Sequence, residues 1–330
     1  MNTKDLKESL HFLSKNMTNK KSIIESYNSF IFDKNRIIVF NDNYSLEVPF
    51  DSKIQVRVPA EETLKIISGI QDSEITLKVE ENNLQIKGKR VKAAITCFDW
   101  DESITETIEA KSKWYGAADN FNQGIKLCLF STSTDISNAV INSISVGGNI
   151  IQSTDNYRVS RFLLKKKMKT FLLPLTSAIL LSQLKTEEYC LDENWIHFKN
   201  TDGSIMHTRI VEGSFPDTSQ LFEIEGPIFH LPEKLHEQID LVSTLAEGDF
   251  VTDKKIKVEI HEGILRCRAE NETGWIESDI ELDTGESIAF TINPIFFSEV
   301  LKLSSTAVTD GEKIVFESEN FEHIMTLFGE

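Results

Sequence analysis

The chain has 330 residues, 40% of them hydrophobic, and a formal net charge of −17 at pH 7. This length corresponds to two or three ordinary domains. No apolar run approaches the roughly 20 residues that cross a bilayer, and the amino terminus lacks the apolar stretch of a secretion signal. The four cysteines form no CxxC pair and are expected to be small buried side chains in a reducing compartment. We therefore expect a soluble, cytoplasmic protein.

The first part of the chain predicts the order helix, strands, helix, strands. Apolar residues at helical spacing are followed by two strand-like segments, and a second helix then begins after Pro59. Proline is favoured in the first helical turn because its missing N–H would be unpaired there. The segments are the helix marked by Leu6, Leu10, Leu13 and Met17, strands 29–32 and 36–40, helix 61–70, and strand-like stretches 74–87 and 89–98.

The same order recurs twice, and Pro174 and Pro294 again introduce the second helix. Residues 40–46 (FNDNYSL) are also echoed by residues 153–159 (STDNYRV). Three repeated domains are therefore predicted, at 1–118, 119–222 and 223–330; chance similarity in a chain rich in short strands is the alternative. The second unit has a helix at Ile125, Cys128 and Leu129, strands 139–146 and 149–153, helix 174–184, and strands 188–198 and 204–211. The third has a helix at Leu235, Ile239, Val242 and Leu245, strands 255–260 and 264–269, helix 294–303, and strands 313–317 and 323–328.

The charge of −17 argues at first against a nucleic-acid partner, because phosphate binding depends on Lys and Arg. The distribution is more informative, since lysines gather on the first helix and its exit while acidic residues dominate the late segments. The densest basic run is Lys165, Lys166, Lys167 and Lys169. A solvated loop is favoured for it over a specific phosphate site, because blocks of like charge often only solvate the chain.

Catalytic motifs are missing from the sequence. It contains no GxGxxG, GxxxxGK[ST], GxSxG or HExxH pattern, and its seven histidines are scattered. Nothing singles out a carboxylate pair among the many acidic residues. We therefore predict a protein that is not an enzyme and uses no cofactor or metal.

Several landmarks together resemble one known family. They are V-P-A at 58–60 before a helix ending S-G-I at 68–70, T-D-N-Y-R-V at 154–159, E-G-S-F-P-D at 212–217, and E-N-E-T-G at 270–274 followed by I-N-P at 292–294. In this order and spacing they resemble the bacterial sliding clamp, the beta subunit of DNA polymerase III, over the whole chain. The G-x-F-P-D match is the most specific. The chain is short and acidic for that family, which suggests a phage-encoded clamp.

The resemblance implies an α+β fold with three clamp domains, helices lining a central hole and antiparallel sheets on the outer rim. Two chains would close head to tail as a homodimeric ring around duplex DNA, in a sequence-independent way, and act as a processivity factor in DNA replication. A DNA polymerase and a clamp-loader ATPase are the implied partners. The DNA contacts carried over are Lys20, Lys21, Lys65, Ser68, Ser137 and Asn138. The family often has a basic residue where Ser68 stands, and Glu61 and Glu62 lie on the same helix.

The family also implies a hydrophobic pocket that receives a short peptide from partner proteins. Its members here are Thr154, Tyr157, Arg158, Val159, Pro216, Leu221, Ile324, Thr326 and Leu327. An apolar floor with polar groups at its rim suits an extended peptide. The family usually has Gly at position 156, but Asn tolerates a positive φ; residues 328–330 do not match its ending. Val159, Leu221 and Ile324 could alternatively be plain core.

Two other classes remain open on the sequence. An enzyme acting on nucleotides or DNA would need an acid or histidine cluster, which the sequence does not offer. A non-catalytic β-rich structural or assembly protein could share the repeated fold without encircling DNA.

Overall fold

The computed structural model describes residues 1–17, 25–99 and 109–329. The chain forms two compact units. Unit 1 comprises Met1–Asn122 and Thr176–Ile210, and unit 2 comprises Gln123–Leu175 and Val211–Glu330. The predicted boundaries after residues 118 and 222 stay a prediction. No helix in the described ranges is long and apolar enough to cross a membrane.

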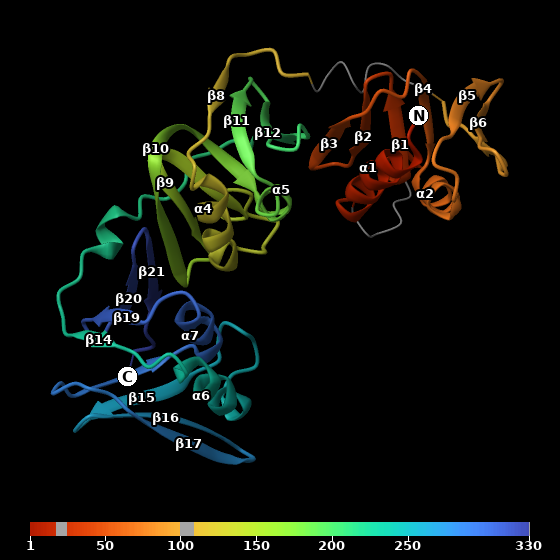
Figure 1. Cartoon of the computed structure of the whole chain (residues 1–330). Coiled ribbons are helices and arrows are strands. Elements are labelled where there is room, and N and C mark those ends of the chain that lie inside the picture. The colour runs from red at the N-terminus through yellow and green to blue at the C-terminus, as the bar shows by residue number, and fades with distance from the viewer. Residues whose placement is uncertain (18–24, 100–108, 330) are drawn as a thin grey trace. The chain divides into compact units, whose positions relative to one another are not determined.

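Unit 1 contains an eight-stranded antiparallel sheet in the order β4-β1-β2-β3-β13-β12-β11-β8 and a three-stranded antiparallel sheet in the order β5-β6-β7. Helices α1 and α2 lie side by side on one face of the red strands in Figure 1. The bounds are α1 Thr3–Lys15, η1 Glu25–Asn28, β1 Ser29–Asp33, β2 Arg36–Phe40, β3 Tyr44–Pro49, β4 Gln55–Pro59, α2 Ala60–Gly69, β5 Thr76–Glu80, β6 Asn83–Lys87, β7 Lys92–Thr96, β8 Trp114–Gly116, α5 Leu175–Leu181, β11 Thr186–Leu191, β12 Trp195–Asn200 and β13 Ile205–Arg209.

Unit 2 contains a six-stranded antiparallel sheet in the order β14-β19-β20-β21-β10-β9 and a four-stranded antiparallel sheet in the order β17-β16-β15-β18. The bounds are α4 Phe121–Cys128, η2 Leu129–Ser131, β9 Ser143–Thr154, β10 Arg158–Pro174, η3 Ser219–Phe222, β14 Ile228–His230, α6 Leu235–Val242, η4 Ser243–Leu245, β15 Ile256–His261, β16 Ile264–Asn271, β17 Gly274–Glu281, β18 Ile288–Ile292, α7 Pro294–Leu301, β19 Thr306–Thr309, β20 Lys313–Ser318 and β21 Phe321–Thr326.

The helices are held by apolar stripes and caps. Leu6, Leu10 and Leu13 of α1 are fully buried, and the Asn2 side chain accepts the N–H of Lys4 at the amino end. In unit 2, α6 and α7 pack against each other over β15 and β16 (Figure 1), and their buried side chains join one core with the strands. These helices therefore cover the apolar faces of the sheets, as a two-layer α+β fold requires.

The sequence echo is a repeated turn. The Asn41 side-chain oxygen accepts the N–H groups of Asn43 and Tyr44, and the Asp155 carboxylate accepts those of Tyr157 and Arg158. Both are Asx turns, and each connects two consecutive strands: β2 to β3 in unit 1, and β9 to β10 in unit 2. The predicted helices after Pro59, Pro174 and Pro294 are confirmed, as are the pairs β1–β2, β15–β16 and β20–β21.

Several local predictions were wrong. Residues 139–153 form no hairpin, because β9 runs through Gly147 and Gly148 and pairs along its length with β10. Gly148 has a φ of 58°, and the register shifts on both sides of Met168, so a bulge bends one continuous ribbon where a turn was expected. The lysine run 165–169 lies in β10 and is not a loop. Stretch 188–198 divides into two strands. Only Pro294 sits in the first helical turn; Pro59 is the N-cap of α2, and Pro174 ends β10.

Candidate functional site

The turn between β9 and β10 fixes the first group of predicted pocket residues. The Thr154 hydroxyl donates to the carbonyl of Arg158 at 2.8 Å and accepts the N–H of Asn156 at 3.1 Å. Asn156 has a φ of 76°, the conformation that explains why Asn can stand where the family usually has Gly. The turn leaves the Tyr157 side chain 47% exposed, with its ring centroid 6.4 Å from that of Phe296.

Arg158 is buried and ties this turn to two other elements. Its Nε atom donates to Asp155 at 2.8 Å, and its terminal nitrogens donate to Glu299 of α7 and to the carbonyl of Phe130 in η2. The guanidinium lies 3.9 Å from the ring centroid of Phe296. A buried charge with these partners is a fixed part of the framework. The contribution of Arg158 to the site is to position Tyr157 and Phe296.

The floor of the site is the β10–β21 pair. Val159 lies opposite Ile324, and both pack with Val315 in a small buried cluster that Phe222 and Ile224 cover. Val159 and Ile324 are thus core residues, whereas Leu221 is 44% exposed. A plain core role was the alternative for all three residues; it fits Val159 and Ile324, and it does not fit Leu221.

The segment with Pro216 and Leu221 is anchored against this floor. Pro216 is exposed, and Thr218 donates to Gln152 of β9 at 2.9 Å. The Lys313 ammonium donates to the carbonyls of Leu221 and Glu223, at 2.9 and 2.8 Å. The single turn η3 is therefore held from both sides, which presents Leu221 at the surface.

The last strand completes the site. The Thr326 backbone N–H donates to the Tyr157 carbonyl at 3.2 Å, so the two side chains stand on joined strands. Leu327 is half-buried against the core of α6 and α7. All nine residues predicted for the pocket lie in unit 2, and we call the surface that they are predicted to form the peptide surface: Thr154, Tyr157, Arg158, Val159, Pro216, Leu221, Ile324, Thr326 and Leu327.

The predicted DNA-contact residues fall into separate places. On α2, the Lys65 ammonium is 2.5 Å from Glu61, whose hydrogen bond raises the pKa of Lys65, and the Ser68 hydroxyl is 3.2 Å from His11. In unit 2, Ser137 donates its N–H to Asp135 at 2.9 Å, and the adjacent Asn138 closes the following turn by accepting from Asn142. Lys20 and Lys21 lie outside the described residues.

Comparison with known proteins gives a consistent result. No protein-family model matches the chain. A beta sliding clamp of Rickettsia felis is 24% identical over 339 residues, covering 91% of this chain and 88% of that protein. One from Streptococcus pneumoniae is 28% identical over 176 residues, covering 48% of this chain and 45% of that protein. Among solved structures, the DNA polymerase III beta chain of Streptococcus pneumoniae superimposes with a TM-score of 0.85 at 18% identity, over 100% of this chain and 98% of that one. The beta subunit of Pseudomonas aeruginosa gives 0.83 at 15%, over 99% and 98%.

The chain is similar to beta sliding clamps in sequence over most of its length, and it has their fold. Clamps of this family are non-catalytic processivity factors of DNA replication, and the predicted fold class is confirmed by the full-length structural match.

Family landmarks did not reveal every residue near the predicted peptide surface of this chain. Phe130, Phe296, Glu299 and Lys313 hold or flank it, yet they come from helices and a strand outside the quoted motifs. The only sequence signal was the spacing of Phe296 and Glu299, three residues apart after Pro294, which places both on one face of a helix. Their partner Arg158 could not be paired with them from sequence alone.

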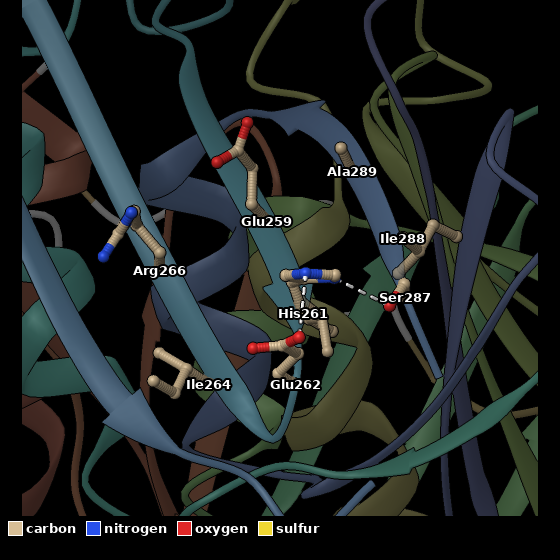
Figure 2. Close-up of a pocket in the computed structure, with 9 residues that line it drawn as sticks. Glu259, His261, Glu262, Ile264, Arg266, Ser287, Ile288 and Ala289 are labelled. Carbon is tan, nitrogen blue, oxygen red and sulfur yellow. Dashed lines mark hydrogen bonds and ion pairs between the residues drawn. The ribbon is translucent and has the colours of Figure 1, made fainter. Parts of the chain in front are cut away.

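The protein also has an open cavity away from the peptide surface. It has a volume of about 510 Å³ and lies on the outer side of β15, β16 and β18. Figure 2 shows His261 beside Ser287, with its Nδ1 atom 3.0 Å from the hydroxyl, and Glu259 and Arg266 on neighbouring strands. None of the predicted site residues that the structure describes lines this cavity.

Proposed function

We propose that this clamp encircles duplex DNA as a ring of two chains and tethers a DNA polymerase through the peptide surface. The observation that carries the proposal is the exposure of two apolar side chains, Tyr157 and Leu221, in segments that adjoin the buried Val159–Ile324 pair. Exposed apolar side chains held on a buried apolar framework suit capture of a short hydrophobic peptide. A loader ATPase would open the ring, and the cytoplasm is the proposed place of action. The short, acidic chain favours a phage genome as its source.

DNA retention in this proposal depends on topology more than on affinity. The candidate contacts at Lys65, Ser68, Ser137 and Asn138, together with Lys20 and Lys21, would be weak and independent of sequence, since only the three lysines among them carry a positive charge and the whole chain has a net charge of −17. Weak contact allows sliding, and a closed ring prevents loss of the DNA.

The test removes the two exposed apolar side chains. A Tyr157→Ala, Leu221→Ala double variant is expected to bind a short, hydrophobic, fluorescein-labelled peptide at least about tenfold more weakly, because central aromatic and apolar anchors carry most of such binding energy. The matched control is Ile264→Ala, which removes a side chain of similar exposure (43%) in the cavity of Figure 2. Both proteins are also assayed for the length of DNA that a clamp-dependent polymerase copies per binding event. Unchanged binding and copying by the double variant would contradict the assignment of the peptide surface.

A further inference from the structure

The densest basic run of the chain lies in the ribbon that β9 and β10 form side by side (Figure 1). Four lysines occur there within five residues: Lys165, Lys166, Lys167 and Lys169. Acidic residues are missing around them, because residues 156–186 contain no Asp or Glu and residues 136–154 contain no charged side chain. In a chain with a net charge of −17, the ribbon is therefore a local concentration of positive charge.

An irregularity of the ribbon brings these lysines to the surface, and we call residues 164–170 the lysine bulge. Residues 164–167 lie opposite the single residue Asn149 of β9, and residues 169–170 lie opposite Gly147 alone. In a regular strand successive side chains point to opposite faces, yet the three consecutive lysines of the run are all exposed. The extra residues therefore turn outward charges that a regular strand would divide between its two faces.

Buried side chains fix the lysine bulge in the fold. Leu164 and Met168, which flank the three consecutive lysines, are 6% and 5% exposed, and Phe171 beyond them is also buried. Earlier in the same strand, Arg161 is joined to Glu322 of β21 by an ion pair of 2.6 Å. A solvated loop, which the sequence favoured for this run, has no such anchors. The lysines project from a framework that the core holds in place.

The facing segment of β9 leaves room beside the lysine bulge. It is Gly147-Gly148-Asn149, which carries no charge and little side chain. A carbon added to Gly148 would have no atom within 4 Å, whereas one added to Gly147 would stand 3.0 Å from the Thr170 hydroxyl. Space for a ligand is therefore open next to Gly148.

The chemistry of the run indicates what it can bind. Lysine ammonium groups are hydrated point charges, without the fork geometry by which arginine recognises one carboxylate or phosphate. Four of them within at most about 13 Å of extended chain suit a ligand with regularly repeated negative charges. The nearby rings of Phe162 and Phe171 are buried and cannot stack on bases. A nucleic-acid backbone, held by charge alone, has these properties.

We propose that the lysine bulge binds the phosphate backbone of single-stranded nucleic acid without base preference. A flexible single strand can bring several successive phosphates to so short a stretch, whereas a duplex, which is stiff over about 150 base pairs, presents fewer of them. The site is separate from the candidate duplex contacts on α2 and at Ser137 and Asn138. Binding at the lysine bulge does not depend on the proposed ring; its use, to hold a template strand near a tethered polymerase, rests on the proposed function.

A second role for strand lysines is to deter the addition of further strands to a sheet. The ladder between β10 and β21 ends at Phe162, so the lysine bulge continues past the last paired residue on that side. Protection of an edge predicts that loss of the lysines causes aggregation and leaves nucleic-acid binding unchanged. Phosphate binding predicts the reverse.

Fluorescence anisotropy of a labelled thymidine strand of about 12 nucleotides, within the length that one single-strand site covers, tests the proposal on the full chain. Lys165→Gln with Lys167→Gln should bind at least about tenfold more weakly at about 20 mM salt, with a log–log salt slope shallower by about 1.4, because two phosphate contacts are lost. Lys165→Arg with Lys167→Arg should retain the binding, because the charge is kept.

The matched control removes two other exposed strand lysines, by Lys78→Gln with Lys257→Gln. Each of these lysines pairs with a carboxylate, and they lie in different units. This variant has the same net charge as the Gln variant of the lysine bulge, yet it should bind the strand like the unchanged chain. An equal loss in both variants would mean that net charge controls binding, and would overturn the site.

A further variant keeps every lysine. Asn149→Asp places a carboxylate opposite residues 164–167 and should weaken binding several-fold at low salt, because one cation of the site is then neutralised. Asn194→Asp adds the same charge at an exposed bend between β11 and β12 and should not. Unchanged binding by Asn149→Asp and by the Gln variant of the lysine bulge would overturn the proposal, and aggregation of that Gln variant with binding retained would assign the lysines to edge protection.

Competition separates the possible ligands. A single strand should displace the labelled strand better than a duplex of the same length or a polyglutamate chain of the same charge. Stronger displacement by the duplex, or by polyglutamate, would overturn the assignment to a single strand in favour of duplex phosphates or of an acidic protein segment. The assay contains no polymerase, so a chain that binds the strand at the lysine bulge but supports no processive synthesis would overturn the proposed function alone.

Discussion

Arg158 shows how one buried side chain can hold other residues of the proposed peptide surface in place. It is buried and joins the β9–β10 turn to α7 and η2 through Asp155, Glu299 and the Phe130 carbonyl. Removing one member of a buried ion pair leaves its partners without a counter-charge. We therefore expect Arg158→Ala to lower the free energy of unfolding by roughly 3 kcal/mol, measured by urea titration.

The control for this change is Arg161→Ala. Arg161 also pairs with a carboxylate, Glu322, but both side chains are partly exposed, so a loss of about 1 kcal/mol or less is expected. Equal losses in the two variants would contradict the positioning role of Arg158.

A pair of buried histidines makes the large sheet of unit 1 sensitive to acid. The Nδ1 atoms of His197 and His207 lie 2.7 Å apart, so one of the two must carry the proton between them. The Nε2 atom of His197 lies 3.1 Å from the Asp192 carboxylate, and that of His207 lies 3.6 Å from the Glu47 carboxylate. Glu47 also accepts a hydrogen bond from Arg36. Burial, reinforced by His207, lowers the pKa of His197 to about 4. His197 is therefore neutral in the folded protein at neutral pH.

This pKa fixes the direction of a pH dependence. Between about pH 6.5 and 4, the unfolded chain binds a proton at residue 197 that the folded protein does not bind. The contribution of His197 to the free energy of unfolding is therefore fully present above this window and is lost as the pH falls through it. The size of the pKa shift limits the loss of unfolding free energy that His197 can cause to roughly 3 kcal/mol. Urea unfolding at pH 7, 6 and 5 should show it, and His197→Gln should reduce the slope. His261→Gln, on an exposed side chain, should leave the slope unchanged; an equally steep slope in His197→Gln would refute this origin.

Some strands could be predicted from the residues next to them in sequence, whereas others depend on pairing with a distant segment. The hairpins β15–β16 and β20–β21 were predictable because alternation and turn residues lie next to each other in sequence. The Gly147–Gly148 pair gave the same signal as a turn, but both sides of β9 pair with β10, so the chain continues through a bulge. The residues around Gly147 and Gly148 do not distinguish a turn from a bulge, because the partner strand β10 follows only after the separate turn that begins at Asp155.

The peptide surface divides in the same way. Its T-D-N-Y-R-V and P-D segments could be recognised by resemblance, because each is a short continuous motif that forms its own turn. The contacts of Arg158 with Glu299, and of Lys313 with the Leu221 carbonyl, join residues far apart in sequence. No periodicity or spacing encodes such contacts, so the structure was needed to separate exposed Leu221 from buried Val159 and Ile324.

For the chain as a whole, the position of negative charge should matter more than its total of −17. Lys65, the one predicted lysine contact within the described residues, is paired with Glu61, and nearby Glu62 also raises its pKa. Replacing Glu61 and Glu62 by Gln should free this ammonium for a phosphate. We expect several-fold tighter binding to linear duplex DNA at low salt, with a salt dependence steeper by about one released counterion.

The matched control removes the same two charges elsewhere. Glu259→Gln with Glu262→Gln changes the net charge equally but lies on the outer side of β15, within the cavity of Figure 2. If DNA reaches α2, only the α2 variant should show the steeper salt dependence, measured by fluorescence anisotropy from 20 to about 200 mM salt, the range over which such slopes are large. An equal gain in both variants would mean that net charge, acting at a distance, controls DNA binding, and that α2 does not contact the phosphates.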